Sequence, residues 1–592
     1  MILQALNDYY RRKIDDPDPA KRLPAFGLEQ KEIPFLLEIT ANGELVQLRD
    51  TRELVGKKKI GQSFRVPQGV KKTSGVAANL LWDSMEYVLG VDTRGKAERV
   101  VEQHAAFRAR IEALPTLARE DAGIHAVLLF LDSFERNRLE AESAWPEMLE
   151  TNPVMSFRLH GDIDLVCQRP AVVNAALNVS DEENVPQAMC LVSGDMAPVE
   201  RLHAPIKGVW GAQTSGANIV SFNVRAFESY GKTQRQGENA PVSKAVAFAY
   251  TTALNHLLRK DSPQRIQVGD ASAVFWAERD DELETALAEI FGEPPKEDPD
   301  RNTRAVGALY QALHSGKLGG LEGENRFHML GLAPNAARIS IRFHHCLPLR
   351  DLAARILTHF EDLKMVRGKN DAEYPSLFRL LTAVAAQGKA DNIPPNLGGA
   401  VVDAALGGPN VLYPSLWLNA AVNRCRAEQS VNYLRAAVIK ACLNRQIRRQ
   451  SHVSNDSPEK EFLPMLDLTN VNAAYRLGRL FSALEKIQEE ASPGLNATIR
   501  DRYYGAASST PVAVFTTLLR LKNSHLKKLS IGRGIWFEKL LGEVLGPIAD
   551  FPKHLTLQDQ GRFALGYYHQ RQAFFTKSDD TSTATQGTQS GA

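Results

Sequence analysis

The hydrophobic positions in the first 350 residues follow two periods, which predicts a mixture of strands and helices. Residues 35–40 and 44–49 are apolar-rich runs on either side of Asn42-Gly43, and an Asn-Gly pair is typical of a tight hairpin turn. Residues 96–114 carry apolar side chains at helical spacing, which predicts a helix. Ser243 follows a proline-containing turn and is expected to cap a helix that runs to about Arg259.

Further segments complete this pattern. Strands are also predicted at 155–159, 163–168, 188–193, 217–224, 271–277 and 338–343. After about Leu347 the strand patterns stop, and helices are predicted at 349–363, 375–388, 415–449, 469–490, 511–529, 534–544 and 557–575. The predicted fold class is therefore α+β, a mixed body followed by an all-helical part.

The same pattern predicts the domain organisation. We expect an α+β body at 1–350, a helical connecting region at 351–460, a helical bundle at 461–576 and a disordered tail at 577–592. A polar break at 451–461 separates the two helical parts, and the tail lacks apolar residues that could anchor it. The bundle, from about Met465, is expected to fold as a separate module.

Composition narrows the class of protein. The chain has 592 residues, of which 44% are hydrophobic and 24% charged, values typical of a globular protein. No run approaches the ~18 apolar residues that a transmembrane helix needs, and the amino terminus becomes charged too early for a secretory signal. The five cysteines are widely spaced without a CxxC pair, so we expect neither disulfides nor a zinc site. These features predict a cytoplasmic protein without a membrane anchor or a cofactor.

Catalytic motifs are missing from the sequence. It contains no GxxxxGK[ST], no GxGxxG after a strand, no HExxH and no GxSxG. His344 and His345 are adjacent in a predicted strand and should face opposite sides, so they are not expected to share a metal ion. We therefore expect no catalytic residues and no metal ligands, although a nuclease site built from carboxylates far apart in the sequence stays an open alternative.

The charge is balanced overall, with 71 basic and 69 acidic residues, so any nucleic-acid binding must come from local basic patches. The densest patch lies between residues 57 and 75, where glycines separate the cations. Its candidate contacts are Lys57, Lys58, Lys59, Lys71, Lys72, Thr73 and Ser74. Glycines allow a phosphate backbone to approach closely, and lysine, threonine and serine can donate hydrogen bonds to it. A solvated surface loop is the competing interpretation.

Three glycine-rich loops are further candidates. The loop at 314–323, here the Gly-Lys loop, places Lys317 beside Gly319 and Gly320, a combination that suits entry into a DNA groove. Polar loops at 207–216 and 229–239 contribute Lys207, Gln213 and Lys232. Flexible connectors and ordinary turns are the competing interpretations.

The predicted helices carry basic faces. Arg445, Arg448 and Arg449 are spaced to share one face of a helix, and so are Arg520, Lys527 and Lys528. Such a face could hold a nucleic-acid strand without regard to its sequence, or it could simply be solvated.

Several longer blocks carry a family resemblance. They are the amino-terminal MILQALNDYYRR, residues 72–75 with 79–90, and residues 221–231, 239–252, 269–278 and 331–338. In this order they resemble the large subunit of the type I-C CRISPR surveillance complex, Cascade, over about residues 1–450. The helical part that follows is similar in length and character, and it resembles the small subunit of that complex.

The resemblance implies a noncatalytic DNA-recognition subunit. Such a subunit sits with the other Cascade subunits near the 5′ handle of the CRISPR RNA, reads the protospacer-adjacent motif in double-stranded target DNA and helps to open the duplex. It then holds the displaced single strand and recruits a helicase–nuclease. We expect Lys71, Lys72, Thr73, Ser74 and Asn79, together with the Gly-Lys loop, to read the motif. The enzyme alternative is a metal-dependent nuclease or RNA-processing endonuclease of the same system.

Overall fold

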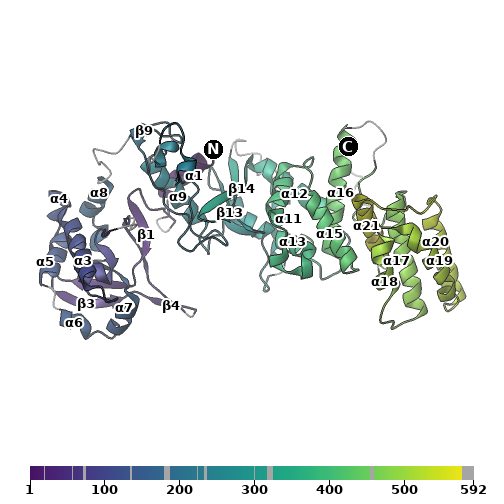
Figure 1. Cartoon of the computed structure of the whole chain (residues 1–592), viewed down its shortest axis with the longest axis horizontal. Helices are drawn as coiled ribbons and strands as arrows, with labels where there is room; N and C mark the ends of the chain where they lie inside the picture. The colour runs from purple at the N-terminus through teal and green to yellow at the C-terminus, as the bar shows by residue number, and fades with distance from the viewer. Residues whose placement is uncertain are drawn as a thin grey trace. The chain divides into compact units, whose positions relative to one another are not determined.

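The computed structural model describes residues 1–18, 21–56, 58–70, 75–133, 136–178, 187–222, 224–232, 236–298, 300–315, 325–453 and 459–575 (Figure 1). The chain divides into two compact units. The first unit comprises residues 6–204 and 222–253, and the second comprises residues 1–5, 205–221 and 254–592. Each unit has its own hydrophobic core.

A four-stranded sheet forms the centre of the first unit. Its strands, in the order β3-β2-β8-β7, are β2 (Phe35–Ile39), β3 (Leu45–Asp50), β7 (Trp82–Ser84) and β8 (Val154–Leu159). β2 runs antiparallel to β3 and parallel to β8, and all of its residues are buried. Phe157 on β8 stacks against Phe107 of α3 (Ala97–Glu112) and meets Phe130 of α5 (Ala122–Ser133) edge-on. These aromatic contacts fix both helices on one face of the sheet.

Further helices and ribbons complete this unit. The helices are α1 (Ile2–Ile14), α2 (Met85–Leu89), α4 (Thr116–Arg119), α6 (Arg136–Glu140), α7 (Trp145–Thr151), α8 (Pro170–Asn178) and α9 (Lys244–Leu257), of which α1 and α9 each have one end in the second unit. Within the described residues, two-stranded ribbons pair β1 (Leu28–Glu32) with β6 (Ser63–Pro67), β4 (Glu53–Val55) with β5 (Lys58–Ile60), and β9 (Gln187–Met189) with β10 (Met196–Pro198).

The second unit contains an antiparallel four-stranded sheet. Its strands are β11 (Arg265–Val268), β12 (Ala271–Ala277), β13 (Arg326–Asn335) and β14 (Arg338–Pro348), paired in chain order. One face buries Phe275, Phe327 and Phe343 in the core. Gly331 lies opposite Phe343, and a Cβ at this glycine would come within 2.3 Å of the phenyl ring. The ring can therefore lie over the neighbouring strand only because residue 331 has no side chain.

The remaining helices pack on this sheet and on one another. They are α10 (Leu283–Phe291), α11 (Arg301–His314), α12 (Leu349–Leu363), α13 (Leu377–Val384), α14 (Leu397–Gly407), α15 (Ser415–Ala427), α16 (Tyr433–Val453), α17 (Ala473–Ala491), α18 (Ile499–Ala507), α19 (Pro511–Leu526), α20 (Ile531–Leu545) and α21 (Leu557–Ala573). α17 and α21 approach each other closely because each has a glycine at the crossing. A Cβ at Gly478 would meet the Phe563 carbonyl oxygen at 2.0 Å, and one at Gly566 would meet that of Tyr475 at 1.9 Å.

The predicted fold class, α+β, is confirmed. The hairpin of residues 35–49 forms as β2 and β3, with Gly43 at φ +80° in its turn. Ser243 caps α9, since its hydroxyl oxygen accepts a hydrogen bond from Val246 N. The helix predicted at 349–363 is α12, with the same bounds.

Three of the other predicted elements are wrong. After β8 the chain turns at Gly161 (φ +89°) and forms a short 3-10 helix, Val166–Gln168, in place of the strand predicted at 163–168. The strand predicted at 217–224 is reduced to isolated bridges at Ala217 and Asn218. The long helix predicted at 415–449 is broken between α15 and α16, where Gln429 takes a left-handed conformation (φ +45°). In each case the local apolar pattern is overridden by a turn that packing imposes.

The unit boundaries also differ from the predicted domains. The strands of residues 1–350 fall in two units, and the sheet β11–β14 shares one core with helices α10–α21. The predicted bundle at 461–576 belongs to this core: Val366 N donates to the Pro464 carbonyl, and Tyr568 Oη donates to the Val366 carbonyl. A sheet exposes an apolar face until helices cover it, and here the covering helices come from later in the chain. The tail at 577–592 lies outside the described residues.

Among the described helices, none combines enough length with enough hydrophobicity to cross a bilayer.

Candidate nucleic-acid interface

The basic segment is defined here as residues 70–79, and the first unit holds its first and last residues in place. Trp82 Nε1 donates to the Pro67 carbonyl at 2.8 Å, and Val70 N donates to Asn79 Oδ1 at 2.9 Å. Asn79 N in turn donates to Asp83 Oδ2 at 2.9 Å. Trp82 and Asp83 are buried in β7, the edge strand of the central sheet. The two ends of the segment, Val70 and Asn79, are therefore joined directly and fixed to the sheet.

This geometry corrects the role predicted for Asn79. Its side chain is 5% exposed, and its oxygen already accepts a backbone hydrogen bond. Contact with DNA would break the base of the segment, so Asn79 is a positioning residue. Four other predicted contacts and a fifth from the same patch lie outside the described residues: Lys71, Lys72, Thr73, Ser74 and Lys57.

The ribbon β4–β5 carries the rest of this patch. Lys58 lies in β5, and Lys59 follows it with an exposed side chain. Lys59 Nζ lies 3.3 Å from Glu147 Oε2, and Glu147 also binds Arg52. Arg52 also pairs with Asp50, so two carboxylates meet two cations here, and the charge of Lys59 is engaged within this cluster.

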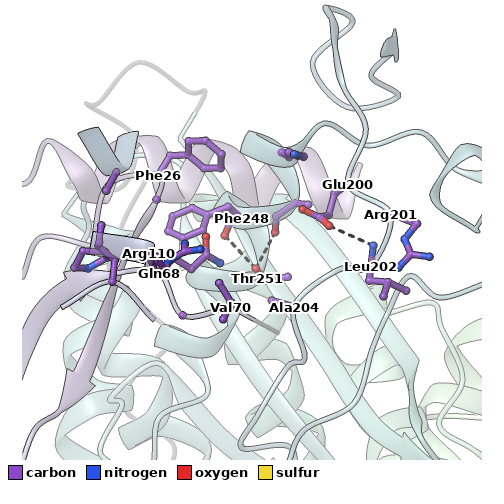
Figure 2. Close-up of a pocket in the computed structure, with 17 residues that line it drawn as sticks. Phe26, Gln68, Val70, Arg110, Glu200, Arg201, Leu202, Ala204, Phe248 and Thr251 are labelled. Atoms are coloured by element: carbon purple, nitrogen blue, oxygen red, sulfur yellow. Dashed lines mark hydrogen bonds between the residues drawn. The ribbon is translucent and has the colours of Figure 1, made fainter. Parts of the chain in front are cut away.

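A cavity of about 530 Å³ opens in the first unit beside the base of the basic segment (Figure 2). Residues 67–70 form part of its wall, and Phe248 and Leu80 contribute apolar surface. Its described lining includes the cations Arg110, Arg201 and Lys244 and one carboxylate, Glu200. Glu200 Oε1 accepts a hydrogen bond from Leu202 N at 3.3 Å. The cavity therefore combines apolar surface with an excess of positive charge.

Arg110 carries a charge that no described residue neutralises. The helix α3 presents it one turn after the buried Phe107. Its Nε atom is buried, and no hydrogen bond joins it to any residue that the structure describes. Burial lowers the pKa of the Arg110 guanidinium, but the group stays protonated at physiological pH. A half-buried guanidinium group without a described anionic partner favours the binding of an anion.

The loops beside the strands give their cations different surroundings. Lys207 and Gln213 are exposed, on a loop whose backbone is anchored where Lys207 N donates to Asn255 Oδ1 at 2.7 Å. Lys232 Nζ donates to the Glu238 carbonyl at 2.7 Å, so this ammonium group is bound to the backbone of its own loop. The Gly-Lys loop residues Lys317, Gly319 and Gly320 lie outside the described residues.

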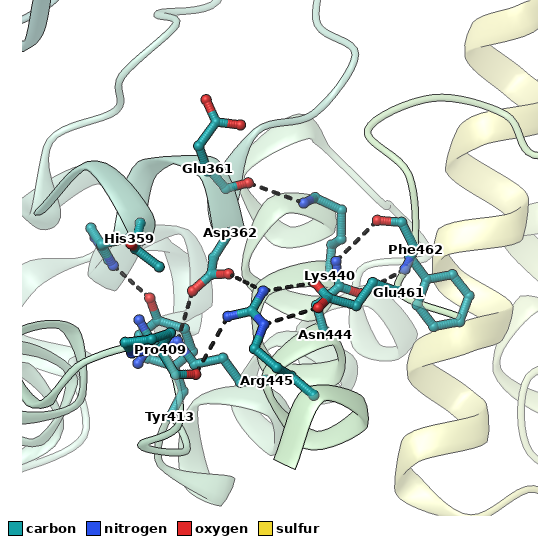
Figure 3. Close-up of polar contacts among 12 residues, drawn as sticks. His359, Glu361, Asp362, Pro409, Tyr413, Lys440, Asn444, Arg445, Glu461 and Phe462 are labelled. Carbon is teal, nitrogen blue, oxygen red and sulfur yellow. Dashed lines mark hydrogen bonds and ion pairs between the residues drawn. The ribbon is translucent and has the colours of Figure 1, made fainter. Parts of the chain in front are cut away.

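The second unit contradicts part of the predicted helical face. Arg445 on α16 is fully buried (Figure 3). Its Nε atom donates to Asp362 Oδ2 at 2.7 Å, and Nη1 donates to the carbonyls of Ala404 and Val411 at 2.6 and 2.8 Å. The guanidinium carbon lies 3.9 Å from the centre of the Tyr413 ring. Arg445 therefore joins α16 to α12 and to the chain around α14, and it cannot contact DNA.

Its neighbours on α16 have different roles. Arg448 Nη2 pairs with Asp362 Oδ1 at 3.0 Å and with Glu461 Oε2 at 2.7 Å, so its charge is also used inside the unit. Arg449, the next residue, is exposed. The helix α16 packs against α12, α15 and α21. Arg445 and Arg448 are three residues apart, a spacing that predicted a face exposed to solvent. In the structure both side chains instead pair with Asp362.

Comparison with known families identifies the chain. A sequence model of the family described as CRISPR-associated protein (Cas_Csd1) matches residues 6–575. The chain belongs to this family. The predicted family resemblance is thus confirmed, whereas no curated protein matches the chain significantly. The Cas_Csd1 match includes the cavity, the base of the basic segment and the Arg445 cluster.

Three further predicted contacts of the Cas_Csd1 chain are exposed. Arg520 lies near the end of α19, and Lys527 and Lys528 follow that helix. Lys522 on the same helix instead pairs with Glu538 at 2.6 Å. These three cations are therefore accessible, unlike Arg445.

The described part of this Cas_Csd1 chain contains no group of three or more His, Cys, Asp or Glu side chains that could hold a metal ion. His344 and His345 turn to different neighbours, as predicted from their adjacent places in a strand. His344 Nε2 lies 3.5 Å from His328 Nδ1, and His345 Nε2 lies 2.8 Å from Asp403 Oδ1.

The sequence did not indicate the cations of the cavity. Arg110, Arg201 and Lys244 lie far from the basic runs and far from one another in the chain. Only the fold brings them together, from α3, a loop and α9. One local signal exists at Arg110, which follows Phe107 by three residues and therefore lies next to the buried face of its helix.

Proposed function

We propose that this Cas_Csd1 family member is the noncatalytic DNA-recognition subunit of a CRISPR RNA-guided surveillance complex. In this role it reads the protospacer-adjacent motif in double-stranded DNA, aids opening of the duplex and holds the displaced strand. The observation that carries the proposal is the base of the basic segment. Val70 and Asn79, which flank the basic run in the sequence, are joined to each other and fixed to the central sheet, and this supports a role for the run in recognition.

The physical requirements of such a complex agree with this role. Base pairing with the guide RNA reads the target sequence, so the protein needs only a short duplex reader and a cationic path for the strand. The reader must be held accurately, and a loop fixed at both ends to a sheet meets that condition. A nearly balanced total charge suits a subunit that also binds other proteins.

The proposed role includes several partners. They are the other Cascade subunits, the 5′ handle region of the CRISPR RNA, and the helicase–nuclease that is recruited after target binding. The exposed cations Arg449, Arg520, Lys527 and Lys528 are the proposed contacts for the displaced strand, because phosphate contacts need no particular base sequence. The role places the chain in the cytoplasm, where it meets invading DNA.

The test is duplex binding by the complex assembled with the full chain. The variant Lys71→Ala/Lys72→Ala should bind a motif-bearing target about tenfold more weakly or worse, since each lost contact is worth about 1 kcal/mol or more. Lys369→Ala/Lys389→Ala removes two exposed lysines of the second unit and is the matched control. Unchanged affinity of the first variant at physiological salt would exclude the segment from the interface.

Absence of catalysis is part of the proposal. The purified chain, incubated with Mg²⁺ or Mn²⁺ and labelled DNA or RNA, should leave the nucleic acid intact. Metal-dependent cleavage that disappears on substitution of a single Asp or Glu would replace the proposal with the nuclease alternative.

A further inference from the structure

We propose that the cavity of the first unit takes one unstacked nucleotide of DNA, with its base against the apolar lining and its phosphate on Arg110 and Arg201. The inference rests on the proposed function in one respect, namely that this nucleotide belongs to the strand that unpairs beside the motif.

The apolar part of the cavity suits a base. Phe248 is 7% exposed, and the rings of Tyr10 and Phe26 meet it edge-on with centroids 5.9 and 5.5 Å away. These contacts hold the Phe248 ring in place before any ligand arrives. Phe248 and Leu80 therefore give a base a fixed apolar surface to contact. The volume, about 530 Å³, lies in the range of sites that enclose small organic ligands.

The cationic part suits a phosphate. Neither Arg110 nor Arg201 forms an ion pair with a described residue, and the described lining carries three cations against the single carboxylate of Glu200. A guanidinium group presents several N–H donors that match phosphate oxygens. A nucleotide joins a flat apolar group to an anion, so it satisfies both parts of the lining at once.

The cavity lies at the foot of the basic segment. Gln68, Gly69 and Val70 belong to its wall, and Lys71 follows directly in the chain. A Cβ at Gly69 would come within 3.1 Å of the Trp82 ring, so packing against Trp82 favours glycine here, and the wall has no side chain at this position. The exposed amide of Gln68 can both donate to and accept from a base edge. Extruding a base costs least where the duplex is already opening.

The experiment uses the full chain and DNA that carries one 2-aminopurine, whose fluorescence rises when the base leaves the stack. One arm uses a single-stranded oligonucleotide with the probe at its centre. The other arm uses a motif-bearing duplex with the probe at successive positions beside the motif. Wild-type protein should raise the fluorescence several-fold in the first arm and at one position in the second.

Two variants remove the two parts of the site separately. Arg110→Gln should weaken binding about tenfold and lower the salt dependence by about one counterion. Ala204→Leu places a larger side chain in the cavity, so it should abolish the fluorescence rise and leave the salt dependence unchanged. Arg99→Gln, exposed on the same helix as Arg110, and Ala113→Leu, exposed at the end of that helix, are the matched controls and should behave as wild type.

The outcomes separate this inference from the proposed function. A fluorescence rise that persists in both Arg110→Gln and Ala204→Leu would overturn the nucleotide site, and so would no rise with the wild-type chain. If the wild-type chain shows no preference for the motif duplex, the proposed function fails, while the single-stranded arm still decides the cavity. Unchanged fluorescence together with lost assembly of both variants with other Cascade subunits would assign the cavity to a protein partner and overturn the inference.

Discussion

Arg110 and Arg445 are both helical arginines withdrawn from bulk water, yet their surroundings are opposite. Arg445 pairs with the buried Asp362, donates to two carbonyls and lies over the Tyr413 ring. Arg110 lines a cavity, and its buried Nε has no partner among the described residues. Arg445 therefore stabilises the packing of α16 through its carboxylate partner, whereas Arg110, beside a cavity, is available to an anionic ligand.

The largest loss of stability should come from removing the part of the chain that contains Arg445. The fragment Met465–Ala592 keeps α17–α21 but loses Val366 and Met365, which Tyr568 and His569 of α21 contact. We expect the isolated fragment to lack the cooperative melting of the full chain in circular dichroism, because it exposes that side of α21. A cooperative transition near that of the full chain would show that these helices form the separate module predicted from the sequence.

Substitution of Arg445 alone should have the next largest effect on stability. Arg445→Met removes one of the two arginines that pair with the buried Asp362 and leaves Arg448 as the other, so the free energy of unfolding should fall by about 3 kcal/mol, the lower end of the cost of breaking a buried pair. Denaturant unfolding measures this loss. Arg449→Met, on the same helix but exposed, is the control and should change stability by less than about 0.5 kcal/mol. Equal stability of the two variants would contradict the structural role of Arg445.

Acid should lower the stability of the second unit, which contains two buried histidines. Burial lowers the pKa of His359 and that of His569 to about 3. The unfolded chain takes up protons near pH 6.5, whereas these folded histidines stay neutral until about pH 3. Stability should therefore fall as the pH decreases through this window, by about 2 kcal/mol per histidine at pH 5. Melting at pH 7 and pH 5 measures the loss, which should be smaller in His359→Gln. An identical loss in that variant would remove His359 from the explanation.

Lys440 is a buried cation whose contacts compensate poorly for its loss of hydration. Burial lowers the pKa of Lys440 to about 8, and among the described residues its Nζ donates only a long hydrogen bond, 3.4 Å, to the Glu361 carbonyl. Lys440→Met should therefore stabilise the chain by about 1–2 kcal/mol at pH 7. The gain should shrink above pH 8, because the folded wild-type chain then loses the proton while the unfolded chain keeps it. Destabilisation in denaturant unfolding at pH 7 would show that the ammonium group contributes more than its burial costs.

The smallest effect on stability is expected at Arg110. Arg110→Gln breaks no ion pair with a described residue, so the free energy of unfolding should change by less than about 0.5 kcal/mol. Denaturant unfolding without DNA measures this directly, since bound DNA would stabilise the wild-type chain more than the variant. A loss of stability as large as that of Arg445→Met would mean that Arg110 also stabilises the fold. The two arginines would then not differ in role.

Elements defined by neighbours within a few residues could be predicted from the sequence alone. The Asn42-Gly43 hairpin follows from a turn that needs positive φ, and the start of α9 follows from the hydroxyl of Ser243. The bounds of α12 follow from apolar side chains at helical spacing. Membership of the Cas_Csd1 family rests on blocks of residues that are likewise contiguous in the chain.

Only the tertiary structure decided which polar groups build the fold and which are left to bind. Arg445 was spaced like a surface residue, but Asp362, 83 positions away, lies against it in the core. Asn79 followed a basic run, yet its oxygen accepts the hydrogen bond that closes the base of that run. The cavity cations come from three distant parts of the chain. A sequence shows the spacing of charges along one element, whereas the partner of each charge comes from another element and depends on how the two pack.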